Sequence, residues 1–227
     1  MPKQQESNPK VVTVRGRLSF PSWTAQEAYD RSQSGQYPAK SVAEAKPEFS
    51  LVLEQPQVDK FVSKIVDEFF PYCLQQFVND EKKDRLDASE IAELTKQVQK
   101  HDGEGVYNTP FKKVSDKTLE LVPEAAGVIK IIGPTGGNFE LKAVAWDESQ
   151  LDPVDPDILK FPVIKPINET VHQMYPGCYV AVTINLYAYH NGKLPGFSAG
   201  ATVAVFREDG ERFGGGVSVD EDEMFMD

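Results

Sequence analysis

The stretch from Tyr175 to Phe206 constrains the fold of this chain more than any other. Apolar residues alternate in it with polar or aromatic ones, which is the period-two pattern of a half-buried β-strand. The alternating apolar residues are Val180, Val182, Ile184, Leu186 and Ala188. Asn191-Gly192 then supplies the two positive-φ positions of a type I′ turn. A return strand with Ala199, Ala201, Val203 and Val205 on one face completes the pattern, so we predict one long β-hairpin.

Two glycines interrupt the return strand of this hairpin. Gly196 and Gly200 stand where a strand interior usually carries a side chain. Glycine at such positions is typical of a sharp bend or of the close approach of another backbone. The pattern therefore favours a small closed β-barrel.

The remaining elements are predicted from periodicity and capping signals. Strands are expected at Val11–Phe20 and Glu48–Leu53, and a second hairpin at Val128–Ile132 and Phe139–Trp146. An amphipathic helix runs from Val58 and ends at Pro71, and a second helix begins at Asp87, where Glu90 completes a capping box, and ends at His101. Between Pro21 and Pro47 we expect a long loop with room for a short helix, and we favour a binding role for it.

The composition is that of a globular protein. The hydrophobic share of 40% is ordinary for a globular domain, and no apolar run is long enough to cross a membrane. The first ten residues are polar and lack the apolar core of a secretory signal, so we expect a cytoplasmic protein. The two cysteines, Cys73 and Cys178, are expected to be reduced packing residues.

The charge is unevenly distributed along the chain. A net charge of −11 opposes nucleic-acid binding at first sight, because phosphates are neutralised by Lys and Arg. Residues 217–227, however, hold five acids and no base, whereas residues 1–46 hold seven bases against four acids. This asymmetry leaves a basic first segment that is compatible with a polyanionic ligand.

Several basic and aromatic residues are candidates for binding a single nucleic-acid strand. Alternation places Arg15 and Arg17 on the same strand face, where they suit phosphate contacts or, equally, salt bridges on a solvated face. Rings near the hairpin tip suit base stacking, although packing under a loop is the alternative for each of them. The full candidate set is Arg15, Arg17, Lys40, Lys46 and Lys193 for phosphates, and Trp23, Tyr37, Tyr187, Tyr189 and Phe197 for bases.

Enzyme signatures are not found in the sequence. His101, His172 and His190 have no metal-ligand spacing among themselves or with the cysteines. Neither a Gly-x-Ser-x-Gly elbow nor a Walker motif occurs. We therefore expect a binding protein without catalytic residues, metal or cofactor.

The C-terminal segment carries its own signal. Gly214-Gly215-Gly216 predicts a flexible tether. An acidic run then precedes an aromatic residue, and the residues expected to contact a partner are Asp220, Glu221, Asp222, Glu223 and Phe225. Such a tail can compete with nucleic acid for the basic groove or insert its ring into a partner's pocket. A solubilising end is the alternative.

These features resemble the phage-encoded single-stranded DNA-binding proteins with an OB-fold. The likeness rests on the blocks that begin at Tyr175, Asn185 and Phe213, namely Tyr175-Pro-Gly-Cys-Tyr179, Asn185-Leu-Tyr-Ala-Tyr189 and Phe213-Gly-Gly-Gly216, and on Arg17-Leu-Ser-Phe20 near the start. The family ends its tail in a pattern from which this chain departs, because Phe225 is not the last residue.

The resemblance implies a mainly β protein. Residues 1–213 would form an OB barrel with one or two helices inserted around 57–101, and residues 214–227 a flexible acidic tail. The implied function is binding and protection of single-stranded DNA with little sequence specificity during phage DNA replication and recombination. The tail would recruit replication or recombination proteins and compete with DNA. The alternative is a phage structural or assembly protein, and the sequence leaves homodimerisation open.

Overall fold

The computed structural model describes residues 8–35, 38–79, 86–145, 163–164, 174–190 and 194–213. Its strands are β1 Val11–Ser22, β2 Glu48–Glu54, β3 Phe111–Lys112, β4 Ala125–Ile132, β5 Glu140–Ala145, β6 Val163–Ile164, β7 Tyr179–His190, β8 Pro195–Gly200 and β9 Val203–Glu208. The helices are α1 Ala25–Ser32, α2 Gln55–Ser63, α3 Phe70–Asn79, α4 Ala88–Lys100 and α5 Asp116–Leu121, with a π-helical segment, η1, at Lys64–Phe69. None of the described helices combines the length and apolar character needed to span a membrane.

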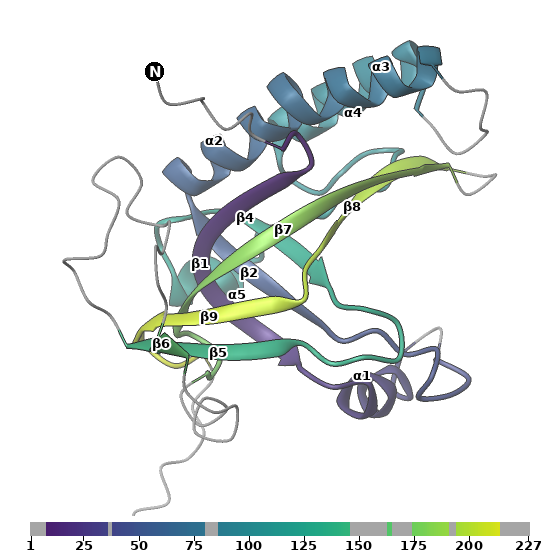
Figure 1. Ribbon diagram of the computed structural model, residues 1–227. Coiled ribbons are helices and arrows are strands. Elements are labelled where there is room, and N and C mark those ends of the chain that lie inside the picture. Colours follow the sequence, from purple (N-terminus) through teal and green to yellow (C-terminus); the bar gives the residue numbers. More distant parts are fainter. Residues whose placement is uncertain are drawn as a thin grey trace, which may run out of the picture.

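Five strands close into a barrel. The order β1-β2-β4-β8-β7 returns to β1 through the β1–β7 pairing (Figure 1). All of these pairings are antiparallel except β4–β8, which is parallel. A five-stranded barrel with this order is the OB-fold, so the predicted fold class is confirmed. Strand β9 continues from β8 away from the barrel and pairs with β5, which pairs in turn with β6.

The long hairpin predicted from the sequence is present. Strand β7 pairs with β8 near the hairpin tip and with β9 further from it. One extra residue at the β8–β9 junction shifts the register, because Asn185 is opposite Gly200 while Val182 is opposite Ala204. The expectation that Val203 and Val205 share the buried face was therefore wrong, and Ala204 is buried instead.

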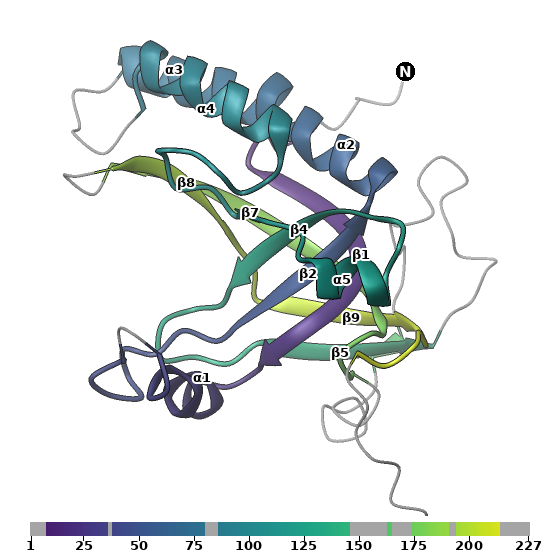
Figure 2. The same ribbon diagram turned by 180° about the vertical axis from the view of Figure 1, so that it is seen from behind.

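Helices cover one end of the barrel. In Figures 1 and 2, α2, α3 and α4 form a layer across one opening, and α1 lies near the opposite end. Their apolar faces join the barrel interior in one core, in which Phe61, Phe69 and Leu94 pack with Val182 and Leu186. The capping box expected at Asp87 and Glu90 is present at the start of α4.

The helix that was expected to end at Pro71 continues through it. Segment η1 ends immediately before α3, and the N–H of Phe70 donates to the carbonyl of Ile65 in the wider π pattern. Proline lacks the N–H of a regular helical turn, and π turns inside helices accommodate such interruptions. The single predicted helix is therefore a longer one with a π segment in its middle.

The second predicted hairpin was wrong. Strand β4 pairs with β2 on one side and with β3 and β8 on the other, so no edge remains for β5. Strand β5 pairs with β9 and β6 instead. The segment between β4 and β5 turns against the α1–β2 loop, where the Gly133 N–H donates to Pro47 O at 2.7 Å.

Helix α5 lies on the outside of the barrel. Val122, directly after α5, forms a small second core with Val52 on β2 and Val128 on β4. The OB-fold commonly binds oligonucleotides on the outer face of its second and third strands, which correspond to β2 and β4 here. Because Val122 packs on Val52 and Val128, α5 covers part of this face.

Candidate nucleic-acid interface

The exposed ring of Tyr187 is the centre of the candidate interface. Tyr187 lies on the outer side of β7 opposite Ser198 on β8, and 49% of its surface is exposed. A Cβ atom at Gly200 would lie 2.7 Å from Cε2 of this ring. The predicted close approach of another backbone is found at Gly196, where a Cβ atom would lie 2.4 Å from Asn108 O, whereas the group close to Gly200 is the tyrosine ring. Glycine at this position allows the ring to lie close over β8.

Two surface hollows meet at Tyr187. The β8 hollow has a volume of about 290 Å³ and is lined by residues that include Lys46, Thr135, Tyr187 and Ser198. The α3 cleft, between α3 and β7, has a volume of about 190 Å³. Its lining includes Lys10, Phe69, Tyr72, Gln76, Tyr187 and Ala188. Tyr187 therefore lines two concave sites, the β8 hollow with the outward residues of β7 and β8 and the α3 cleft with Leu186 and Ala188.

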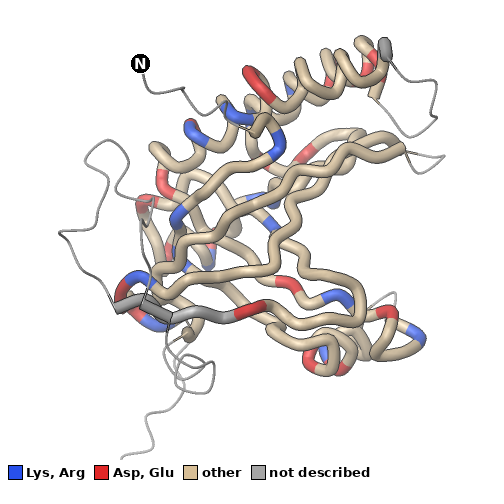
Figure 3. The backbone as a smooth tube through the Cα atoms, in the orientation of Figure 1, with Lys and Arg blue, Asp and Glu red and all other residues tan. Residues whose placement is uncertain are grey.

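Each of these hollows has a lysine as its single charged lining residue among the described residues. The lysine is Lys46 in the β8 hollow and Lys10 in the α3 cleft. The Nζ atom of Lys10 lies 6.0 Å from the centroid of the Tyr187 ring, within cation–π range. Strands β7 and β8 contain no Lys, Arg, Asp or Glu and are tan in Figure 3. The surface around Tyr187 thus combines an exposed ring with unopposed positive charge, which suits a single nucleic-acid strand.

A third hollow extends this surface past α1. Lys46 also lines the α1 hollow, of about 380 Å³, together with Arg31 and two acids, Glu44 and Glu48. The guanidinium of Arg31 donates to the carbonyls of Phe20 and Pro21 at 2.6 Å each. Phe20 is 64% exposed and has a positive φ of 44°, a strained conformation for a bulky residue. The sequence analysis named Phe20 only as the end of the first strand and not as a stacking ring, so it missed this exposed aromatic.

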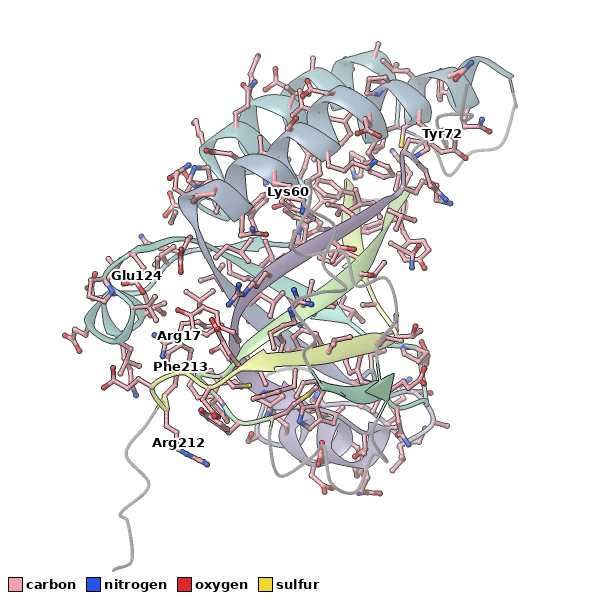
Figure 4. All side chains as sticks on the ribbon, turned by 60° about the vertical axis from the view of Figure 1, so that its left-hand side comes forward. Arg17, Lys60, Tyr72, Glu124, Arg212 and Phe213 are labelled. Atoms are coloured by element: carbon pink, nitrogen blue, oxygen red, sulfur yellow. The ribbon has the colours of Figure 1, made fainter. Side chains whose placement is uncertain are left out.

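The predicted arginine pair has internal partners. Arg17 is buried, and its guanidinium group donates to Gly177 O at 3.1 Å and to Glu211 O at 2.5 Å. The same group stacks on Phe213, 4.6 Å from the ring centroid, as Figure 4 shows. Arg15 forms an ion pair with Glu208. In this structure both arginines stabilise the fold, as in the salt-bridge alternative, and neither presents a free charge to a ligand.

Two of the predicted stacking rings are buried. Trp23 is 7% exposed, and its ring centroid lies 5.3 Å from that of Phe49. Phe197 is 1% exposed and packs against Phe69 and Phe70 at centroid distances of 5.9 and 5.6 Å. A ring must leave the core before it can stack on a base, so these two residues belong to the packing alternative.

The other predicted residues are distributed around the Tyr187 surface or lie outside the described part. Tyr189 has the same parity on β7 as Tyr187 and is half-buried, and burial raises the pKa of its hydroxyl. Lys40 and Lys46 are exposed on the segment between α1 and β2. Tyr37, the Asn191-Gly192 turn with Lys193, and the tail residues Asp220 to Phe225 fall outside the described residues.

Metal-ligating residues do not gather in the described part of the chain. No group of three or more His, Cys, Asp or Glu residues there is arranged to hold a metal ion. Two of these residue types do meet in one pair, in which His190 Nε2 lies 3.2 Å from Glu90 Oε1.

The fold and the site together define an OB-fold barrel with an exposed tyrosine on a locally basic outer face. Residues 151–226 match the family model described as the single-stranded DNA-binding protein of Enterobacter phage Enc34. This segment contains β7, β8 and β9, and hence Tyr187. The match confirms the resemblance to phage-encoded single-stranded DNA-binding proteins that the sequence motifs predicted.

Similar solved structures include single-stranded DNA-binding proteins of two bacteriophages. The single-stranded DNA-binding protein from bacteriophage Enc34 is 18% identical, with 95% of this chain and 90% of that chain covered and a TM-score of 0.45. The same phage protein in complex with single-stranded DNA is 16% identical over 90% of each chain, with a TM-score of 0.48. The bacteriophage T7 single-stranded DNA-binding protein gp2.5 is 12% identical over 92% and 97%, with a TM-score of 0.43. No curated protein matches the sequence.

Proposed function

We propose that this protein binds single-stranded DNA with little sequence specificity, through the surface around Tyr187. The observation that carries the proposal is an exposed ring between two hollows, each lined by a lysine and no acid among the described residues. Bases would stack on Tyr187, and Lys10 and Lys46 would contact phosphates on either side of it. Stacking needs only the π face of a base, so it tolerates any sequence.

The strand would continue from the β8 hollow towards α1. Lys46 lines both hollows, and Lys40 lies on the same connecting segment. Phe20, whose carbonyl accepts a hydrogen bond from Arg31, lines a separate hollow beside α5 and would offer a second exposed ring there. Tyr189 would contribute at the hairpin tip. We assign no catalytic step to the protein.

The biological role that fits this activity is protection of single strands during phage DNA replication and recombination in the host cytoplasm. The match of residues 151–226 to a phage single-stranded DNA-binding family supports this role. The acidic tail, residues 214–227, would recruit replication or recombination proteins and compete with DNA for the Tyr187 surface.

The test is a fluorescence-anisotropy titration with labelled oligothymidine, beside a duplex of equal length, at several salt concentrations. We expect a strong preference for the single strand and a log-log salt slope that steepens by about 0.7 for each phosphate contacted. Equal or absent binding of both ligands at every salt concentration would reject the proposal. A defined large oligomer in that case would favour the assembly-protein alternative.

Deleting residues 217–227 tests the proposed competition by the tail. The deletion removes five acids and no base. We expect tighter binding of oligothymidine, with the largest gain at low salt, where electrostatic competition is least screened. Unchanged affinity at low salt would exclude self-competition and leave recruitment as the tail's proposed role. A variant with the five acids replaced by Asn or Gln separates charge from length.

A further inference from the structure

We propose that the α3 cleft is a subsite for one pyrimidine base of the bound strand. The inference rests on the proposed function, because the base would belong to the same DNA strand that stacks on Tyr187. It adds a base-sized pocket and a preference for one class of base to an otherwise unspecific interface.

The size of the cleft sets the class of base. An apolar cavity of about 150 Å³ is large enough to hold benzene. The α3 cleft has a volume of about 190 Å³, so it has room for one six-membered ring with its substituents. A purine adds a fused second ring and would protrude from the cleft. The volume therefore favours thymine and cytosine over adenine and guanine.

The walls of the cleft suit the flat faces and the polar edge of a pyrimidine. Phe69 and Leu186, which are almost completely buried, and the half-buried Ala188 form apolar walls. Tyr72, on α3 (Figure 4), and Gln76, one helical turn further along, add a hydroxyl and an amide. A pyrimidine edge carries both donors and acceptors, and these two side chains can supply the complementary groups.

The mouth of the cleft is positioned next to the proposed strand path. Tyr187 lines both the cleft and the β8 hollow, so a base beside the one stacked on Tyr187 would be within reach of the cleft. The N–H of Leu186 donates to Lys10 O at 2.8 Å, which fixes the Lys10 backbone beside β7. The Lys10 ammonium at this mouth would hold the phosphate of the inserted nucleotide.

Two adjacent glutamines on α3 provide a matched pair of variants. Gln76 lines the cleft, whereas Gln75 is exposed and does not line it. We expect Gln76→Trp to fill the cleft and to lower the ratio of oligothymidine to oligoadenine affinity by about fivefold or more, the range of one lost base contact. Gln75→Trp should leave the ratio unchanged. Self-stacking of adenines is a property of the oligonucleotide, so it cancels between the two variants.

Cys73 gives a second readout that needs no variant. Cys73 is 7% exposed and lines the cleft, whereas the only other cysteine, Cys178, is 0% exposed and burial raises the pKa of its thiol to about 11. At pH 7.5 a small thiol reagent such as methyl methanethiosulfonate should therefore modify Cys73 first, and mass spectrometry can verify the site. We expect saturating oligothymidine to slow this modification about fivefold or more, and saturating oligoadenine to slow it less than about twofold.

The outcomes separate this inference from the proposed function. Absent single-strand binding by the unaltered protein would reject both. Normal binding combined with equal base ratios in the two Trp variants and no protection of Cys73 would reject only the pyrimidine subsite. Equal protection by both oligonucleotides would also overturn it, because the DNA would then cover the cleft without discriminating between bases. If Gln76→Trp fails to fold, the Cys73 result decides alone.

Discussion

The two ends of β7 carry the same kinds of side chain and differ in what those side chains contact. At the first end, Tyr179 lies beside Arg15 and Arg17, at 5.2 and 5.6 Å from its ring centroid. At the other end, Tyr187 lies beside Lys10, at 6.0 Å. In the sequence, both are aromatic residues near bases and both suggest a surface for a polyanion.

The partners of the bases distinguish the two ends. Arg15 is neutralised by Glu208, and Arg17 is buried against backbone carbonyls and the ring of Phe213. Lys10 in the α3 cleft and Lys46 in the β8 hollow have no acid beside them among the described lining residues, whereas the α1 hollow, which Lys46 also lines, contains Glu44 and Glu48. A basic residue attracts phosphate only when its charge is not already compensated, so we propose the Tyr187 end as the interface. The Tyr179 end instead holds residues 209–213 against the barrel.

The largest expected effect concerns the stability of the Tyr179 end. Arg17→Met removes two hydrogen bonds from a charged donor and leaves the carbonyls of Gly177 and Glu211 without that donor. We expect the free energy of unfolding to fall by about 2–4 kcal/mol, measured by urea denaturation. Arg15→Met, which breaks a partly exposed ion pair, should cost less than about 1 kcal/mol. An Arg17→Met protein that is fully stable but no longer binds DNA would place the interface at this end.

The second-largest expected effect is on the affinity for oligothymidine at the Tyr187 end of β7. Tyr187→Ala removes an exposed ring, and we expect oligothymidine binding to weaken by about 1–3 kcal/mol. The free energy of unfolding should change by less than about 0.5 kcal/mol, because surface substitutions seldom cost more. Tyr187→Phe keeps the ring and should bind almost as tightly as the unaltered protein. If the Ala variant is folded and binds normally, Tyr187 has no stacking role.

Sequence patterns were sufficient for the barrel and for part of the site. The alternation in β7 identified the buried face, and the glycines in β8 identified a close approach, because both depend on local geometry. The partners of Arg17 could not be predicted in this way. Its contacts with Gly177 and Phe213 join segments that are far apart in the chain, and strand alternation only indicates which residues share a face.

Phe20 and Phe197 also show that strand alternation does not predict exposure: Phe20 was not predicted as a stacking ring and is exposed, whereas Phe197 was predicted as one and is buried. The ring of Phe20 is exposed at the irregular pairing between Ser19 and Ser22. Phe197 was expected on the binding face, but it packs under η1 and α3, which the sequence did not place over the hairpin. Lys10 was not among the predicted residues, because it lies beside Tyr187 only through the pairing of β1 with β7.

The smallest expected effect is on the salt dependence of oligothymidine binding, which compares one basic residue from each end of β7. Lys46→Gln and Arg15→Gln each remove one positive charge, so they change the net charge of the protein equally. We expect Lys46→Gln to reduce the log-log salt slope for oligothymidine by about 0.7, the value for one phosphate contact. Arg15→Gln should leave the slope unchanged, since its guanidinium is already paired with Glu208.

Salt titrations of the two variants side by side decide between the two ends of β7. Equal loss of slope in both variants would mean that net charge, and no particular contact, controls binding. A loss confined to Arg15→Gln would mean that DNA displaces Glu208 from its ion pair, and would move the interface to the Tyr179 end. A loss confined to Lys46→Gln is the result expected if uncompensated charge beside an exposed ring is what makes a binding surface on this barrel.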